Sequence, residues 1–103
     1  MKLKLQLIGK LERLSGVESR PSIVAGGTAL FYKKKEIAHF HNDNEIDVRL
    51  TKRVIRQELL KHPKGSKFHH HRSPNSEWIE LRFKRSAHVD EVVRLFKLAL
   101  RQY

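Results

Sequence analysis

The chain has no cysteine and no long apolar run, and these two absences exclude several classes of protein. Without cysteine there is no disulfide framework, no thiol nucleophile and no cysteine-based zinc site. The longest apolar run, residues 29–32, is far shorter than the roughly 20 residues of a bilayer-spanning helix. The amino-terminal residues also lack the unbroken apolar segment and the small-residue cleavage site of a signal peptide. We therefore expect a cytoplasmic protein without a membrane span.

Acidic residues are scarce, with 11 Asp and Glu against 22 Lys and Arg and a formal net charge of +11. A positive field of this kind attracts nucleic acid or small anions. The basic residues are nevertheless spread along the whole chain, and only residues 33–35 are three consecutive lysines. A solvated surface without a polyanionic partner is the competing interpretation.

The 103 residues are enough for one domain, residues 1–103, with a single modest core. Leucines at helical spacing predict a first helix that ends near Gly16. A second helix is predicted from Thr51 to about His62, with Leu59 among its buried residues, and a last helix is capped by Ser86. Alternating patterns predict strands, and these cover residues 28–34, 36–41, 45–50 and 77–84.

This order, α-β-β-β-α-β-α, predicts an α+β fold: an antiparallel sheet of about four strands with helices packed on one face. Because side chains alternate along a strand, the register assigns faces. A three-residue loop over residues 42–44 pairs His41 with Glu45 and His39 with Asp47, whereas a two-residue loop would mix the apolar and polar faces. Ile37 then shares the polar face with both histidines. The predicted apolar face, covered by the helices, comprises Phe40, Ile46, Val48, Ile79, Leu81 and Phe83.

Five of the seven histidines lie in two short stretches, residues 39–41 and residues 69–71. Imidazole titrates near neutral pH, binds metals and transfers protons, so a cluster of histidines indicates a site. His39 and His41 opposite Asp47 suit either carboxylate-oriented imidazoles or a metal pair. Trp78 falls on the same polar face, where it either walls a pocket or is covered by a loop. The lone His62 and His88 are interpreted as helix-terminal residues.

Several spaced motifs resemble the "luciferase domain" family, a group of small bacterial and fungal domains. The motifs are Glu36-Ile37-Ala38-His39-Phe40-His41, Asp47, Arg56-Gln57-Glu58-Leu59, His70-His71-Arg72-Ser73-Pro74-Asn75-Ser76-Glu77-Trp78 and a last helix that ends at Tyr103. The resemblance covers about residues 26 to 103, with Ala38 and Glu77 in place of family glycines. The second half is also similar to YjbR and competence-regulator domains, which implies a nucleic-acid or protein-binding module.

We assign one ligand site to eight residues: His39, His41, Asp47, Arg56, His70, His71, Trp78 and Arg82. The principal hypothesis is a site for an anionic ligand, either nucleotide-like or nucleic acid, in which Arg49, Arg56 and Arg82 contact phosphate and Trp78 stacks. This hypothesis assigns no metal ligand. The alternative is a metal- or acid/base-dependent enzyme that uses His39, His41, Asp47 and His70 or His71, with Glu45 or Glu80 as base. A third hypothesis is an interaction domain with a buried histidine network. The sequence indicates no particular cofactor or oligomeric state.

Overall fold

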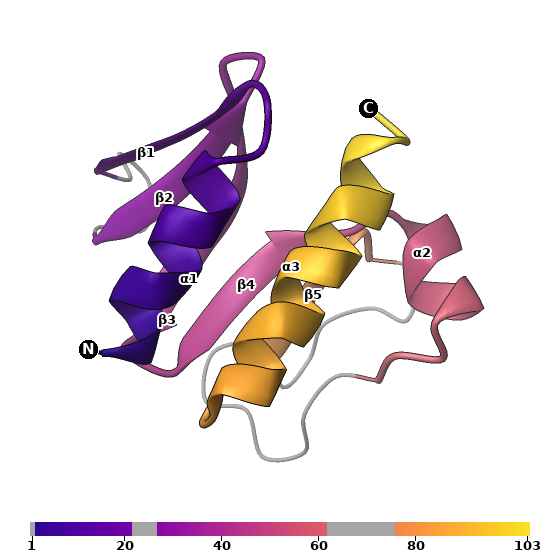
Figure 1. The fold of residues 1–103 in the computed structure, drawn as a ribbon. Coiled ribbons are helices and arrows are strands. Elements are labelled where there is room, and N and C mark those ends of the chain that lie inside the picture. The colour runs from indigo at the N-terminus through magenta and orange to yellow at the C-terminus, as the bar shows by residue number, and fades with distance from the viewer. Residues whose placement is uncertain (1, 22–26, 62–75) are drawn as a thin grey trace.

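The computed structural model describes residues 2–21, 27–61 and 76–103, and their helices and strands form an α+β fold (Figure 1). The elements follow in the order α1 (Leu3–Glu12), β1 (Val17–Pro21), β2 (Thr28–Tyr32), β3 (Lys35–Asn42), β4 (Glu45–Arg49), α2 (Lys52–Gln57), β5 (Trp78–Arg82) and α3 (Ser86–Leu100). The five strands form one antiparallel sheet in the order β1-β2-β3-β4-β5. The predicted fold class is therefore confirmed, with one strand more than expected.

The additional strand, β1, lies at the edge of the sheet and pairs with β2. Only Val17 of its five residues is buried, and Pro21 ends it. An edge strand with one buried side chain carries no alternating pattern, and an edge is where proline is tolerated. The sequence therefore had no periodic signal that would reveal this strand.

The helices α1 and α3 lie side by side on one face of the sheet, as Figure 1 shows. The apolar face that the register predicts is confirmed at Phe40, Ile46, Val48, Ile79 and Phe83, which are all buried. Leu81 is only half-buried. The helices contribute leucines from α1 and a stripe from α3 to the same core, comprising Leu7, Leu11, Val89, Val92, Leu95, Phe96 and Ala99. The other sheet face is left for polar side chains.

The hairpin between β3 and β4 contains a bulge, and the predicted three-residue loop over residues 42–44 is wrong. His39 pairs with Asp47 as predicted, but Glu45 pairs with Asn42 and not with His41. The turn therefore has two residues, and His41 is an extra residue that restores the register. Asn42 stabilises this tight turn because its Oδ1 accepts the Asn44 N–H at 2.8 Å.

A second bulge interrupts the pairing of β2 with β3. Leu30 pairs with Ala38 but Phe31 pairs with Glu36, so Ile37 is the extra residue. Ile37 is 3% exposed and belongs to the core. The prediction that placed Ile37 on the polar face was wrong, because the bulge inverts the alternation at this point.

The ends of α2 and α3 also differ from the prediction. Thr51 caps α2, since its Oγ1 accepts the Val54 N–H at 3.4 Å, but the helix ends at Gln57 instead of near residue 62. Leu59 takes a left-handed conformation (φ 54°) just past the helix and is 85% exposed, not buried. At α3 the N-cap is Arg85 and not Ser86. His88 Nδ1 instead accepts the Lys84 N–H at 3.0 Å, a contact that joins the helix start to the preceding loop.

Residues 62–75, which include the second histidine stretch, lie outside the described residues, so the predictions made for them remain untested. None of the described helices has the length and apolar character needed to cross a membrane. The cytoplasmic location stays a prediction.

Candidate functional site

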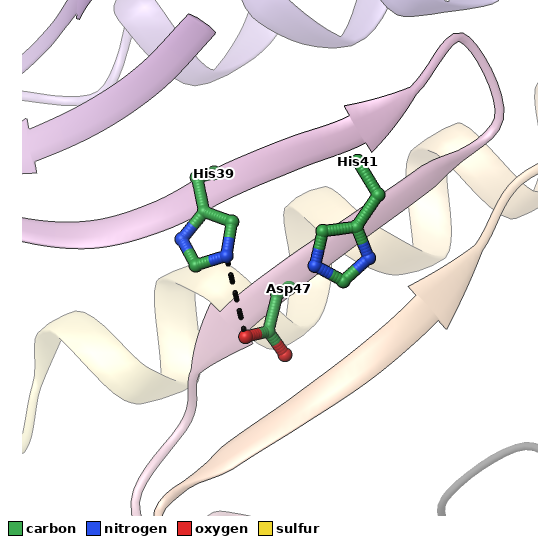
Figure 2. A group of neighbouring side chains, drawn as sticks. All are labelled: His39, His41 and Asp47. Atoms are coloured by element: carbon green, nitrogen blue, oxygen red, sulfur yellow. Dashed lines mark ion pairs between the residues drawn. The ribbon is translucent and has the colours of Figure 1, made fainter. Parts of the chain in front are cut away.

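His39, His41 and Asp47, here called the histidine cluster, project from the sheet face opposite α1 and α3 (Figure 2). His39 and His41 come from β3, and Asp47 comes from the neighbouring strand β4. The His39 Nε2 lies 3.6 Å from the Asp47 Oδ2, and the two imidazole centroids are 5.3 Å apart. The predicted pairing of His39 with Asp47 thus places both imidazoles beside one carboxylate.

A second buried carboxylate lies directly beside the histidine cluster. Glu80 on β5 pairs with Asp47 on β4, and each residue is 1% exposed. The Glu80 Oε1 lies 3.4 Å from the His41 Nδ1. Burial of an ionised carboxylate costs several kcal/mol unless hydrogen bonds or nearby cations compensate for it. Two such groups on adjacent strands therefore favour positive charge at this point.

Glu36 is a second acidic neighbour of His39. Its Oε2 lies 3.7 Å from the His39 Nδ1, on the side of the ring away from Asp47. Sequence reasoning missed this residue because strict alternation places Glu36 on the core face with Ala38. The only signal was its position at the start of the Glu36–His41 motif, and the bulge at Ile37 brings it to the histidine side.

Glu45 and Arg82 form the outer edge of the site. The Arg82 Nε lies 3.5 Å from the Glu80 Oε2 and 3.8 Å from the Glu45 Oε2. A hydrogen bond from Asn42, more than the nearby Arg82 and His41 charges, lowers the pKa of Glu45 although burial opposes the shift. Glu45 is therefore ionised at neutral pH and adds negative charge to this edge.

Trp78 flanks the histidine cluster at the start of β5. Its ring centroid lies 5.6 Å from that of His39, with the two planes tilted by 37°. The indole is half-buried and shares the polar face, as predicted. A partly exposed aromatic ring beside two imidazoles can act as a flat wall for a planar molecule.

The structure brings together five of the eight residues assigned from the sequence: His39, His41, Asp47, Trp78 and Arg82. Arg56 lies on α2 and lines a surface hollow with Ile55, Leu59, Leu60 and Lys61, so its place in the site stays a prediction. His70 and His71 lie outside the described residues. Their participation also stays a prediction.

The donor set of the site fits a metal ion. The possible ligand atoms of His39, His41 and Asp47 all lie within 4.8 Å of one another, and those of His41, Glu45 and Glu80 do so as well. In Figure 2 a ring nitrogen of each histidine faces Asp47. Two imidazoles and one carboxylate are a common ligand set for divalent transition metals.

Comparison with known proteins identifies a family for this chain. A family model described as "Luciferase domain" matches residues 34–99, which is more than half of the chain. The matched region includes the histidine cluster, Glu36, Glu80 and Trp78. No curated protein and no solved structure matches the chain.

Proposed function

The chain belongs to the Luciferase domain family, and we propose that its histidine cluster binds a divalent transition-metal ion. One observation carries this proposal: two imidazoles from β3 and a buried carboxylate from β4 converge, with their ligand atoms within 4.8 Å of one another. A metal held by three side chains keeps further coordination positions for water or substrate. The enzyme hypothesis is thereby favoured over simple ligand binding.

The carboxylates of Glu36 and Glu80, which lie beside the two imidazoles, support the same assignment. Metal-bound histidines usually donate their second ring N–H to a carboxylate, which fixes the tautomer and the ring orientation. The His39 Nε2 lies beside Asp47 while its Nδ1 lies 3.7 Å from Glu36, and the His41 Nδ1 lies 3.4 Å from Glu80. Each imidazole therefore has one nitrogen toward the cluster and the other toward an acidic residue.

The charge of the site favours a cation as the first ligand. Glu36, Glu45, Asp47 and Glu80 surround the imidazoles, and Arg82 contacts two of these residues, Glu45 and Glu80. A free phosphate or carboxylate would meet these acidic groups, and like charges repel strongly where water is scarce. The anionic ligand expected from the sequence is therefore proposed to bind only together with the metal, between Arg82 and Trp78.

The chain's own residues would then have separate roles. Asp47, His39 and His41 hold the ion, and Glu36 and Glu80 orient the imidazoles. When bound, a divalent ion supplies a Lewis acid that polarises an oxygen-containing ligand. Glu80, which is also near Arg82, is placed to accept a proton from His41. We further propose that residues 1–103 act as one domain, which the single sheet and shared core support.

Metal titration of the tag-free protein tests the proposal. We expect one Mn²⁺, Fe²⁺, Co²⁺ or Zn²⁺ ion per chain by calorimetry and elemental analysis after removal of chelators. His39→Ala and Asp47→Asn should each abolish this binding, while His88→Ala, which changes a histidine on α3, should leave it intact.

Replacement of all three histidines at residues 69–71 by alanine separates this site from adventitious binding elsewhere. If that triple variant loses the ion and Asp47→Asn keeps it, the proposed site is wrong. Circular dichroism of each variant confirms that the fold is retained.

A further inference from the structure

A cavity of about 160 Å³ lies at the C-terminal end of α3, the end marked C in Figure 1. We call it the tyrosine cavity. Its lining residues are Tyr32, Lys33, Lys35, Ile37, Arg49 and Tyr103. None of these residues belongs to the histidine cluster. The cavity is therefore a second place where the described residues can take up a small molecule.

The floor and walls of the tyrosine cavity are apolar. Ile37 is buried in the core, and the rings of Tyr32 and Tyr103 lie 6.1 Å apart with a tilt of 35°. A cavity of roughly 150 Å³ holds one benzene-sized molecule. The size and the aromatic walls thus match a single ring.

The rim of the tyrosine cavity is cationic. Lys33, Lys35 and Arg49 line it, and among the described residues no carboxylate side chain does. Two of these cations lie over the cavity's own aromatic faces: the Lys33 Nζ is 5.2 Å from the Tyr32 centroid, and the Arg49 guanidinium is 5.9 Å from that of Tyr103. Glu77 contacts Arg49 at 3.4 Å and compensates for one of the three charges. A positive rim over an apolar floor is complementary to an amphipathic anion.

The Tyr103 phenol adds no negative charge to this rim. Its hydroxyl donates a hydrogen bond to the Arg49 carbonyl oxygen, and burial raises the pKa of Tyr103 to about 12. The phenol is therefore neutral throughout the physiological range. Its ring is held in place by the hydrogen bond, so the wall of the cavity is preformed.

Arg49 was expected on the histidine side as a phosphate contact, and the structure instead places its guanidinium at the tyrosine cavity. We propose that the tyrosine cavity binds a single-ring aromatic carboxylate, with the ring against Ile37 and the tyrosines and the carboxylate beside Lys33, Lys35 and Arg49. This proposal is independent of the metal proposed for the histidine cluster.

Titration of ¹⁵N-labelled protein with benzoate, followed by NMR, tests this assignment. For a ligand of this size we expect a dissociation constant in the millimolar range. Amide signals of residues 32–37 and 103 should shift, while the Trp78 indole N–H, which reports on the histidine cluster, should not. Benzamide, which has the same shape without the charge, and acetate, which has the charge without the ring, should each bind roughly tenfold more weakly, as expected when one charged or apolar contact is lost.

The double variant Lys33→Gln/Lys35→Gln should weaken benzoate binding by roughly tenfold or more, because two charged donors are lost. Lys52→Gln/Lys61→Gln removes the same charge from the region of α2 and should change the affinity less than twofold. Equal binding of benzoate and benzamide, equal loss in the two double variants, or shifts centred on Trp78 would each overturn the proposal. All these lysines are exposed, so the variants should fold, and their amide spectra verify this directly.

Discussion

Individual contacts around His39 show how the site is oriented. Its two ring nitrogens face different carboxylates, Asp47 at 3.6 Å and Glu36 at 3.7 Å. Asp47 is buried, whereas the Glu36 side chain is 21% exposed. This difference in burial matches different roles: the inner carboxylate holds the ion and the outer one fixes the ring.

Replacement of Glu36 by glutamine should weaken metal binding without unfolding the protein. The amide keeps the shape but is a weaker acceptor for the His39 N–H, and loss of an outer partner of this kind costs about 10- to 100-fold in metal affinity. Calorimetric titration with Zn²⁺ measures the change. Glu18→Gln on β1 is the matched control. If Glu18→Gln weakens Zn²⁺ binding as much as Glu36→Gln does, the loss reflects the change in net charge and not the contact between Glu36 and His39.

Tyr103 should ionise late in an alkaline titration. Burial raises the pKa of Tyr103 to about 12, above the ordinary value near 10. Because the folded state prefers the neutral phenol, the stability from this group is complete below about pH 10 and is lost as the pH rises toward 12. Ultraviolet absorbance of tyrosinate should show a late phase that disappears in Tyr103→Phe. Ionisation of Tyr103 near the ordinary value of about 10 would contradict the burial.

The hairpin of β3 and β4 is the element on which the site depends. Its two-residue turn and the bulge at His41 together place His41 beside Glu80 while the pairing of His39 with Asp47 is kept. Asn42 contributes to both features, since its side chain accepts the Asn44 N–H and donates to the Glu45 Oε1 at 2.9 Å. One amide thus links turn geometry to the charge of the site.

Asn42→Ala should therefore change stability and titration together. Loss of the turn contacts should destabilise the protein by about 1 kcal/mol in urea unfolding. The hydrogen bond from Asn42 is the main cause that lowers the pKa of Glu45, so this pKa should rise toward its ordinary value.

The lowered pKa of Glu45 contributes stability that is present above the unfolded value and lost as the pH falls, so the variant should lose less stability in acid than the parent. Carboxyl NMR titration of Glu45 in both proteins provides the measurement. Asp43→Ala is a control within the same turn, and an equal shift there would remove the specific role of Asn42.

Across the whole molecule, the two candidate sites differ in the sign of their charge. The histidine cluster is surrounded by Glu36, Glu45 and Glu80 in a chain of net charge +11, whereas the tyrosine cavity is lined by three cations. The overall positive field opposes the approach of a metal cation and assists that of an anion. Dissolved salt weakens both effects, since the screening length is about 10 Å at 0.1 M.

The two sites should therefore respond to salt in opposite directions. Between low and moderate concentrations of sodium chloride, Zn²⁺ affinity should rise or stay level because screening removes the global repulsion. Benzoate affinity should fall, because screening removes the attraction and chloride competes for the cationic rim. Parallel calorimetric and NMR titrations at matched ionic strength measure both trends. Parallel loss of both ligands would indicate that the local negative charge of the carboxylates, not the global positive charge, controls metal affinity at the histidine cluster.

The register of β3 against β4 shows which features the alternation of apolar and polar residues predicts correctly and where it fails. The alternation of apolar and polar residues correctly pairs His39 with Asp47 and Phe40 with Ile46, because a one-residue slip would bury charges. The same rule fails at Ile37 and His41, where each bulge adds one residue. A bulge depends on the partner strand and the turn, so alternation within one strand contains no sign of it.

The sequence by itself determined the fold class, most of the buried face of the sheet and the convergence of His39, His41 and Asp47, because hydrophobic burial follows local periodicity. Only the tertiary structure decided that Glu36 and Glu80 contact the imidazoles, that β1 forms one edge of the sheet and that Arg49 contacts Tyr103. These features join residues through strand bulges and through the packing of a helix end against a sheet. Their geometry depends on several segments at once, and no single stretch of sequence encodes it.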